Sequence, residues 1–369
     1  LLYFDSPYAF DPGGLTIESV DENRSQARGR NVLYNSQESV KQLQTGLVLD
    51  WNTNIGQISS NIYYSNRDFV GLLPFTYGGN VELNRDFSGA EFSLKNRSES
   101  FEWMIGTSIQ NQADDRKRFE NNEGEKGVKV LDQIESFKSL GAFALGSYNK
   151  SKYSIQAGLR YDIHEISSDD YMLDIGIDQQ YIDYSKSLSA FSPSLGLVYS
   201  LSKNRELYIN YGYTYETPSL SELSANPNGT GFNENLSPMS SSGFDLGFRK
   251  QSQGLSYGLT AFYIDTKDEI VRYELEGFEG MNFYRNLGTS KRLGAELEAS
   301  YNLGKSGVLN ASYTQAKYEF ENQGVSGDLA GIPKSNFSLE WLYAYKNLDL
   351  KLDLKYVNSM FADNNNEVK

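Results

Sequence analysis

Apolar and polar side chains alternate along several stretches of this 369-residue chain. The clearest stretch is 153–162, in which the odd positions hold Tyr, Ile, Ala or Leu and the even positions hold Gly or a polar residue. Stretches 209–216 and 348–356 repeat the alternation. Because successive side chains of a β-strand point to opposite faces, the pattern predicts strands with one face suited to hydrocarbon and the other to water.

Short polar turns alternate with long polar segments between these strands. The predicted turns, rich in Asn, Ser, Gly or Lys, are Asn52–Gly56, Asn96–Ser100, Asn149–Lys152, Ser202–Arg205, Gln251–Gly254, Asn302–Ser306 and Tyr345–Asn347. The long segments are Val70–Arg85, Asn111–Glu135, Ile166–Lys186, Thr217–Ser241, Thr266–Tyr284 and Glu321–Lys334. This alternation is typical of outer-membrane barrels, in which short turns face the periplasm and long loops face outside.

The sequence thus predicts an all-β fold, a transmembrane, antiparallel, up-and-down β-barrel with about fourteen strands. Residues 1–35 are expected to form an extracellular loop, residues 36–357 the strands with their connections, and residues 358–369 the start of another extracellular loop. A soluble β-propeller is the rival, since the turns recur every 43 to 53 residues. A propeller blade packs four short strands into each repeat, whereas this chain shows two longer strands with one polar face.

Aromatic residues fit the barrel prediction. The chain has three tryptophans, Trp51, Trp103 and Trp341, each on an apolar face and close to a short turn. Trp and Tyr concentrate at membrane–water interfaces. We therefore expect the three tryptophans at the periplasmic interface, with Tyr153 and Tyr161 marking the two aromatic girdles.

Composition changes this picture little. The net charge of -14 and the mean hydropathy of -0.53 would suit a soluble acidic protein, and no apolar run approaches the ~18 residues of a membrane helix. A barrel is compatible with both, because its lumen and loops are polar. The acidic excess argues against nucleic-acid binding. The absence of cysteine excludes disulfides, thiolate metal sites and cysteine nucleophiles, and residues 1–10 lack the features of a signal peptide.

Several segments, taken in order, resemble a known family. They are FSPSLGLVYSLSKNRELYINYGYTYETPSLSEL (191–223), NENLSPMSSSGFDLGFRK (233–250), AFYIDTKDEIVRYE (261–274), YRNLGTSKRLGAELEASYNL (284–303), GIPKSNFSLEW (331–341) and MFADNNNEV (360–368). Together with the alternation of turns and loops, they resemble the barrel of TonB-dependent receptors, particularly those for ferric citrate and other ferric siderophores.

This resemblance implies a barrel of roughly 22 strands around a plug. An open sheet of about fourteen strands would leave unpaired edges in lipid, so we expect a barrel fragment without its plug domain. The implied protein lies in the outer membrane of a Gram-negative bacterium, in contact with its lipid. It would bind a ferric chelate outside and import it into the periplasm, with energy from the TonB–ExbB–ExbD complex acting through the plug. A passive porin, or a receptor for cobalamin, haem or oligosaccharide, is the alternative.

Four arginines are candidates for holding an anionic chelate: Arg67, Arg85, Arg160 and Arg292. Each lies on a predicted polar face or at a loop end, and a planar guanidinium matches carboxylate geometry. Ion pairs within the barrel wall, such as Arg160 with Asp162 or Arg292 with Glu296, are the simpler explanation for the last two. Tyr77 and Tyr215 lie in or beside predicted loops and are further candidates, although such residues often only pack loops.

The sequence does not predict a catalytic or metal centre. His164 is the only histidine, and without cysteine the usual transition-metal ligand sets are unavailable. No nucleophile elbow, P-loop, dinucleotide fingerprint or H-E-x-x-H motif is present. We therefore expect a protein that is not an enzyme and has no cofactor of its own.

Overall fold

A single antiparallel sheet of 16 strands makes up most of the computed structural model. The structure describes residues 1–171, 183–229, 231–278, 281–322, 325–362 and 366–369. The strands are β1 (Leu2–Phe10), β2 (Gln37–Thr53), β3 (Gly56–Leu72), β4 (Asn80–Arg97), β5 (Phe101–Asn122), β6 (Glu125–Lys150), β7 (Tyr153–Asp170), β8 (Asp183–Ser202), β9 (Arg205–Glu216), β10 (Met239–Lys250), β11 (Leu255–Tyr273), β12 (Phe283–Asn302), β13 (Val308–Asn322), β14 (Val325–Asp328), β15 (Ser335–Tyr345) and β16 (Leu348–Val357). The helices are α1 (Ile17–Asn23), α2 (Gly29–Leu33), α3 (Leu220–Ser224) and the 3-10 turn η1 (Gly304–Ser306).

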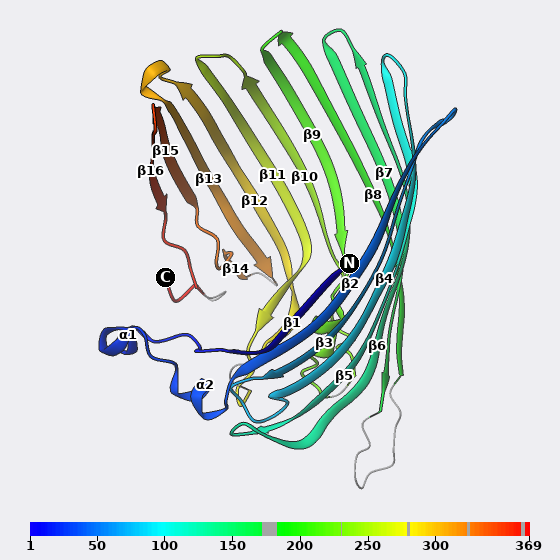
Figure 1. Ribbon diagram of the computed structural model, residues 1–369, viewed down its shortest axis with the longest axis vertical. Coiled ribbons are helices and arrows are strands. Elements are labelled where there is room, and N and C mark those ends of the chain that lie inside the picture. Colours follow the sequence, from blue (N-terminus) through cyan, green and yellow to red (C-terminus); the bar gives the residue numbers. More distant parts are fainter. Residues whose placement is uncertain (172–182, 230, 279–280, 323–324, 363–365) are drawn as a thin grey trace.

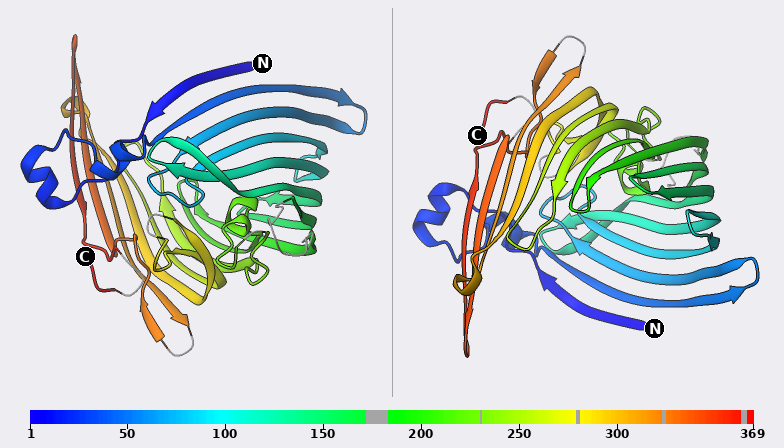
Figure 2. Two further views of the ribbon diagram at one scale, coloured as in Figure 1. Left: turned by 90° about the horizontal axis from the view of Figure 1, so that it is seen from below. Right: turned by 90° about the horizontal axis from the view of Figure 1, so that it is seen from above.

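Sequence neighbours are also sheet neighbours, from β1 through to β16, except that β14 pairs only with β13 beside the main path. Figure 2 shows the sheet as a wall that curves around an inner face. This confirms the all-β, antiparallel, up-and-down architecture. Among the described residues, β1 pairs only with β2, and β16 only with β15.

The two strands beyond the expected fourteen lie in segments predicted as loops. β1 falls within residues 1–35, so the prediction of one continuous loop there was wrong. Pro7 interrupts the alternation of β1, and its pairing with β2 shifts register between Ser6 and Ala9. Proline lacks a donor and is tolerated at such irregular or edge positions. β14 forms a short hairpin with the end of β13, inside the predicted segment Glu321–Lys334.

All seven predicted turns are present, and they lie together at one end of the sheet, at the top of Figure 1. The long connections, with α1, α2 and α3, lie at the other end. Several predicted loops are shorter than expected. In particular, Asn111–Glu135 is mostly strand, because β5 and β6 continue to a tight turn at Glu123 and Gly124. Both turn residues have positive φ, 54° and 99°, as a type I′ hairpin requires. Part of the predicted loop Ile166–Lys186 falls on residues 172–182, outside the described residues.

The outward face carries the predicted apolar residues. On β7, Tyr153, Leu159 and Tyr161 are 55%, 51% and 48% exposed, as expected for side chains that would face lipid. The tryptophans share this face at the short-turn end. Trp51 lies next to the β2–β3 turn, Trp103 lies near the start of β5, and Trp341 donates a hydrogen bond to the Ser306 carbonyl at 2.8 Å.

Among the described residues, no helix is long and apolar enough to cross a membrane.

The connection between β9 and β10 folds back onto the inner face. It contains α3, whose start is closed by a capping box in which Ser219 and Glu222 bond reciprocally. α3 and the following loop bury an apolar cluster against the wall, made of Ile166, Leu220, Leu223, Phe232 and Leu236. This hydrophobic contact positions α3 beside the polar residues of β5 and β6.

Candidate functional site

A cavity of about 510 Å³ lies at the loop end of the inner face. The strands β3, β4 and β5 form one wall, and the β3–β4, β9–β10 and β11–β12 connections cover it. The wall contributes Arg67, Phe69, Val81, Leu83, Arg85, Arg116 and Arg118. The cavity is therefore built jointly by rigid sheet and by loops from distant parts of the chain.

Strand register brings the charged residues of the wall together. Arg67 of β3 pairs with Arg85 of β4, Arg85 pairs with Asp114 of β5, and Asp114 pairs with Glu135 of β6. Arg116 lies two residues after Asp114, and so on the same face. One row of the sheet thus holds two arginines followed by two carboxylates.

Two of these arginines are neutralised by buried carboxylates. Arg85 donates to both oxygens of Asp114, from Nε at 2.8 Å and from Nη2 at 2.6 Å. The Nε of Arg116 donates to Glu135 at 2.6 Å, and its Nη2 lies 3.6 Å from Asp114. The side chains of Asp114 and Glu135 are fully buried. Buried carboxylates are stable only when paired, so this chain of ion pairs fixes both arginines.

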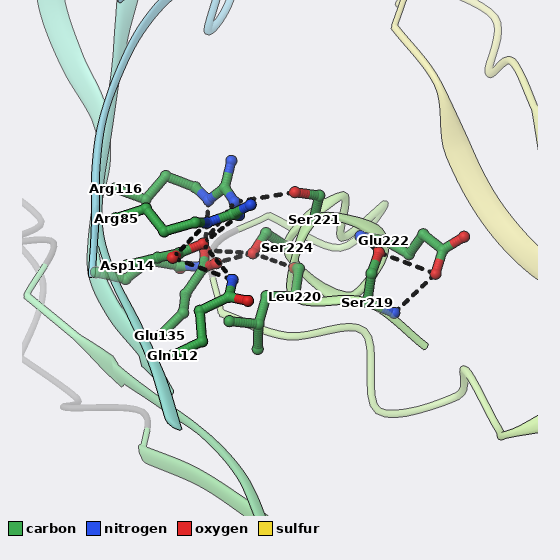
Figure 3. Close-up of polar contacts among 11 residues, drawn as sticks. Arg85, Gln112, Asp114, Arg116, Glu135, Ser219, Leu220, Ser221, Glu222 and Ser224 are labelled. Atoms are coloured by element: carbon green, nitrogen blue, oxygen red, sulfur yellow. Dashed lines mark hydrogen bonds and ion pairs between the residues drawn. The ribbon is translucent and has the colours of Figure 1, made fainter. Parts of the chain in front are cut away.

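The helix α3 completes the ion-pair cluster from the opposite side, as Figure 3 shows. Arg116 Nη2 donates to Ser221 Oγ at 3.1 Å, and Gln133 Nε2 donates to Ser224 Oγ at 3.2 Å. Ser224 also donates to Glu135. The α3 segment is therefore attached to the wall by polar contacts in addition to its apolar cluster.

The other two lining arginines have no such neutralising partner. Within the part of the chain that the structure describes, no carboxylate lies within 4.0 Å of Arg67 or Arg118. The Nε atoms of both are buried without a hydrogen-bond partner. Four guanidinium groups thus face two carboxylates, which leaves two unpaired positive charges in a chain of net charge -14. Such a site attracts anions, and the low dielectric of a partly enclosed cavity strengthens the attraction.

The connections that cover the cavity contribute mainly aromatic and aliphatic side chains. The β3–β4 connection contributes Leu73, Phe75 and Tyr77, and the β11–β12 connection contributes Phe278 and Met281. The rings of Tyr77 and Phe278 meet edge to face, with centroids 6.0 Å apart. Strands β4 to β11 separate these two connections in the sheet, so this contact joins loops from distant parts of the wall.

Three of the six candidate residues line this cavity: Arg67, Arg85 and Tyr77. Arg160 lies elsewhere, in the expected ion pair with Asp162 at 2.6 Å, and also bonds Ser108. The sequence suggests an ion pair of Arg292 with Glu296. In the structure, Arg292 pairs instead with Glu269, at 2.7 Å. Asp268, the residue before Glu269, has a left-handed backbone conformation with φ of 56°. This irregularity of the strand cannot be read from the alternation of apolar and polar residues.

The sixth candidate, Tyr215, lies on the opposite face of the sheet from the cavity. Its neighbour Thr214 lines a smaller inner cavity together with Arg292, and adjacent strand residues point to opposite faces. The role of all six candidates in ligand binding remains a prediction.

Two arginines that line the cavity, Arg116 and Arg118, are not among the residues predicted from the sequence, because they fall within the predicted loop Asn111–Glu135. A signal was present: Asp114, Arg116 and Arg118 occupy alternate positions, as charged residues on one strand face do. His164 lies away from the cavity and stacks on Phe137 at 5.4 Å. Over the described ranges, no group of three or more His, Asp or Glu residues is arranged to hold a metal ion.

A sequence profile of the family described as TonB dependent receptor-like, beta-barrel, matches residues 2–369. Among solved structures, the ferric citrate transporter FecA in its unliganded form has a TM-score of 0.79 at 19% identity, covering 100% of this chain and 55% of that one. The ferric yersiniabactin uptake receptor FyuA from Yersinia pestis has a TM-score of 0.69 at 15% identity, covering 90% of this chain and 52% of that one. The copper transporter OprC has a TM-score of 0.68 at 17% identity, covering 86% of this chain and 52% of that one. The chain thus spans about half the length of these structures.

Proposed function

Because this chain belongs to the TonB-dependent receptor β-barrel family, we propose that it forms part of an outer-membrane receptor and active transporter for an anionic ferric chelate. The receptor would bind the chelate outside a Gram-negative cell and release it into the periplasm. Energy would come from the TonB–ExbB–ExbD complex, acting through a plug domain.

One observation carries this proposal: the loop-covered cavity holds two guanidinium groups, Arg67 and Arg118, that have no carboxylate partner among the described residues. Ferric complexes of carboxylates and catecholates are commonly anionic and offer oxygen acceptors. A hydrogen bond from each guanidinium group to a bound anion would contribute about 1.5–3 kcal/mol. The same charge disfavours neutral ligands such as oligosaccharides, and the packing of α3 onto the wall disfavours an open porin.

The first test compares binding and uptake of radioactive iron by cells that make the receptor from its complete gene and by cells that lack the gene. Ferric citrate and a panel of other ferric siderophores serve as ligands, with growth on each as sole iron source. We expect loss of the gene to abolish uptake of one chelate. Unchanged growth and binding with all of them would remove iron uptake as the function.

A second test neutralises the unpaired charges. Arg118→Gln and Arg67→Gln should each weaken chelate binding roughly 10- to 100-fold, because each removes one charge-assisted hydrogen bond. Arg249→Gln is the matched control, since Arg249 lies near the short-turn end of β10 and pairs with Glu206 at 2.7 Å. Equal effects of all three substitutions would show that the cavity is not the binding site.

A further inference from the structure

The two sides of the cavity differ in chemistry. All four lining arginines belong to the strand wall, beside apolar residues such as Leu83, whereas the covering connections contribute aromatic, aliphatic and uncharged polar side chains. Two of the lining rings are already buried by packing: Phe75 of the β3–β4 connection and Phe283 at the start of β12 are only 7% and 3% exposed. Tyr77 and Phe278, in contrast, remain 46% and 38% exposed although they line the cavity. These two rings therefore offer apolar surface that the described residues do not cover.

The four arginines of the strand wall differ in whether a carboxylate neutralises them. Arg85 forms an ion pair with Asp114, and Arg116 forms one with Glu135. Arg116 also donates a hydrogen bond to Ser221 of α3. Arg67 and Arg118 have no carboxylate partner among the described residues, and their Nε atoms are buried without a hydrogen-bond partner. Arg67 is on β3, and Arg118 is on β5, four positions closer to the loop end than the residue in the row of Arg67. Their charges would therefore be met by two anionic groups at separate points of a ligand.

Resting on the function proposed above, we infer that the ligand is an amphiphilic ferric chelate, with anionic groups toward Arg67 and Arg118 and an aryl or alkyl group toward Tyr77 and Phe278. Ferric citrate, which carries carboxylates and hydroxyls but no apolar group, matches only half of this cavity. It would leave the two rings in contact with polar groups or water, whereas an aryl or alkyl group would bury them.

Specificity for the apolar group would then reside in two loops rather than in the sheet. Tyr77 and Phe278 belong to connections on distant strands, and their edge-to-face contact at 6.0 Å holds them together. A ligand group that packs against this ring pair would therefore contact both loops at once. Phe278 is the sharper probe of the two, because the Phe278 side chain carries no polar group that could bind a chelate.

The experiment measures binding of radioactive iron to outer membranes containing the receptor made from its complete gene. Three probes share an anionic character: ferric citrate, the ferric complex of a citrate-based chelator bearing a fatty acyl chain, and ferric 2,3-dihydroxybenzoylserine. The variants are Phe278→Ala and Phe278→Leu. Phe10→Ala is the control, since Phe10 is 66% exposed on β1 and does not line the cavity.

We expect the wild-type receptor to bind the acylated or the aromatic probe at least about tenfold more tightly than ferric citrate. Phe278→Ala should remove about tenfold of that preference while ferric citrate binding stays constant, Phe278→Leu should restore most of it, and Phe10→Ala should change nothing. The inference would be overturned if the wild-type receptor bound ferric citrate most tightly, or if Phe278→Ala weakened binding of all three probes equally. Either result would leave the proposed function intact. Failure of the wild-type receptor to bind any of the three anionic probes, or any other ferric siderophore, would refute both.

Discussion

At the scale of single residues, the site depends on which arginines are paired. Asp114 is fully buried and is shared by Arg85 and Arg116, so it balances charge on two strands at once. Arg67 and Arg85 are directly opposite each other in the sheet, and like charges so placed repel. Asp114 reduces that repulsion by neutralising Arg85. The unpaired state of Arg67 and Arg118 is thus stabilised by the pairing of their neighbours.

Asp114→Asn should therefore destabilise the receptor. Removing one partner of a buried ion pair typically costs about 3–5 kcal/mol, because Arg85 would remain charged without a carboxylate. Thermal unfolding in detergent, followed by circular dichroism, measures the effect. Glu206→Gln is the control: its pair with Arg249 is one-third to one-half exposed, and such pairs contribute about 0–1 kcal/mol. Equal stability of both variants would contradict the account given for Asp114.

At the scale of elements, α3 is held by two kinds of contact. Its five residues are too few for a stable isolated helix, and the capping box satisfies only its first turn. Leu220 and Leu223 are 4% and 2% exposed within the apolar cluster. Ser221 accepts a hydrogen bond from Arg116, and Ser224 donates one to Glu135. The position of α3 therefore depends on the wall as much as on its own sequence.

Leu223→Ala should release this segment. Truncating a buried leucine costs about 2–5 kcal/mol, and here the loss falls on the docking of residues 217–238 rather than on the sheet. Hydrogen exchange of these residues should become faster, with the strands unchanged. Val20→Ala, in the exposed part of α1, should have no effect on the same peptides. Unchanged exchange in Leu223→Ala would show that the polar contacts suffice.

At the scale of the whole molecule, strands such as β7 separate an apolar outward face from a polar inward face. Leu159 of β7 is 51% exposed and lies on the outward face with Tyr161, whereas Gln156 of the same strand points inward. Leu159→Arg should lower the amount of folded receptor in the outer membrane, because a charge on the lipid face costs about 2–4 kcal/mol near the bilayer centre. Gln156→Arg should leave that amount almost unchanged. Heat-modifiable migration on gels measures the folded fraction, and equal results would argue against the assignment of the two faces.

The parts of the fold that follow local rules could be predicted from the sequence. Alternation identified the strands, and turn chemistry identified all seven short turns. β1 was missed because Pro7 breaks its alternation. The ends of β5 and β6 were missed because residues 111–135 are strongly polar, as strand segments outside a hydrocarbon layer can be.

The candidate site was predictable only in part, for a related reason. Arg67 and Arg85 stand at alternating positions next to recognisable strands, so their face could be assigned. The pairing of Arg116 with Glu135 depends on the unexpected length of β5 and β6. The contact of Tyr77 with Phe278 depends on how loops far apart in sequence fold over the wall, and no local pattern records it.

The positions of the tryptophans determine what optical spectroscopy of this chain can detect. Trp51, Trp103 and Trp341 all lie at the short-turn end, on the face opposite the cavity. Indole emission depends on its immediate surroundings, so the fluorescence of these three residues will respond to detergent or lipid rather than to an occupied cavity. An emission change on ligand addition requires a chromophore at the loop end, and Phe278→Trp would place one there.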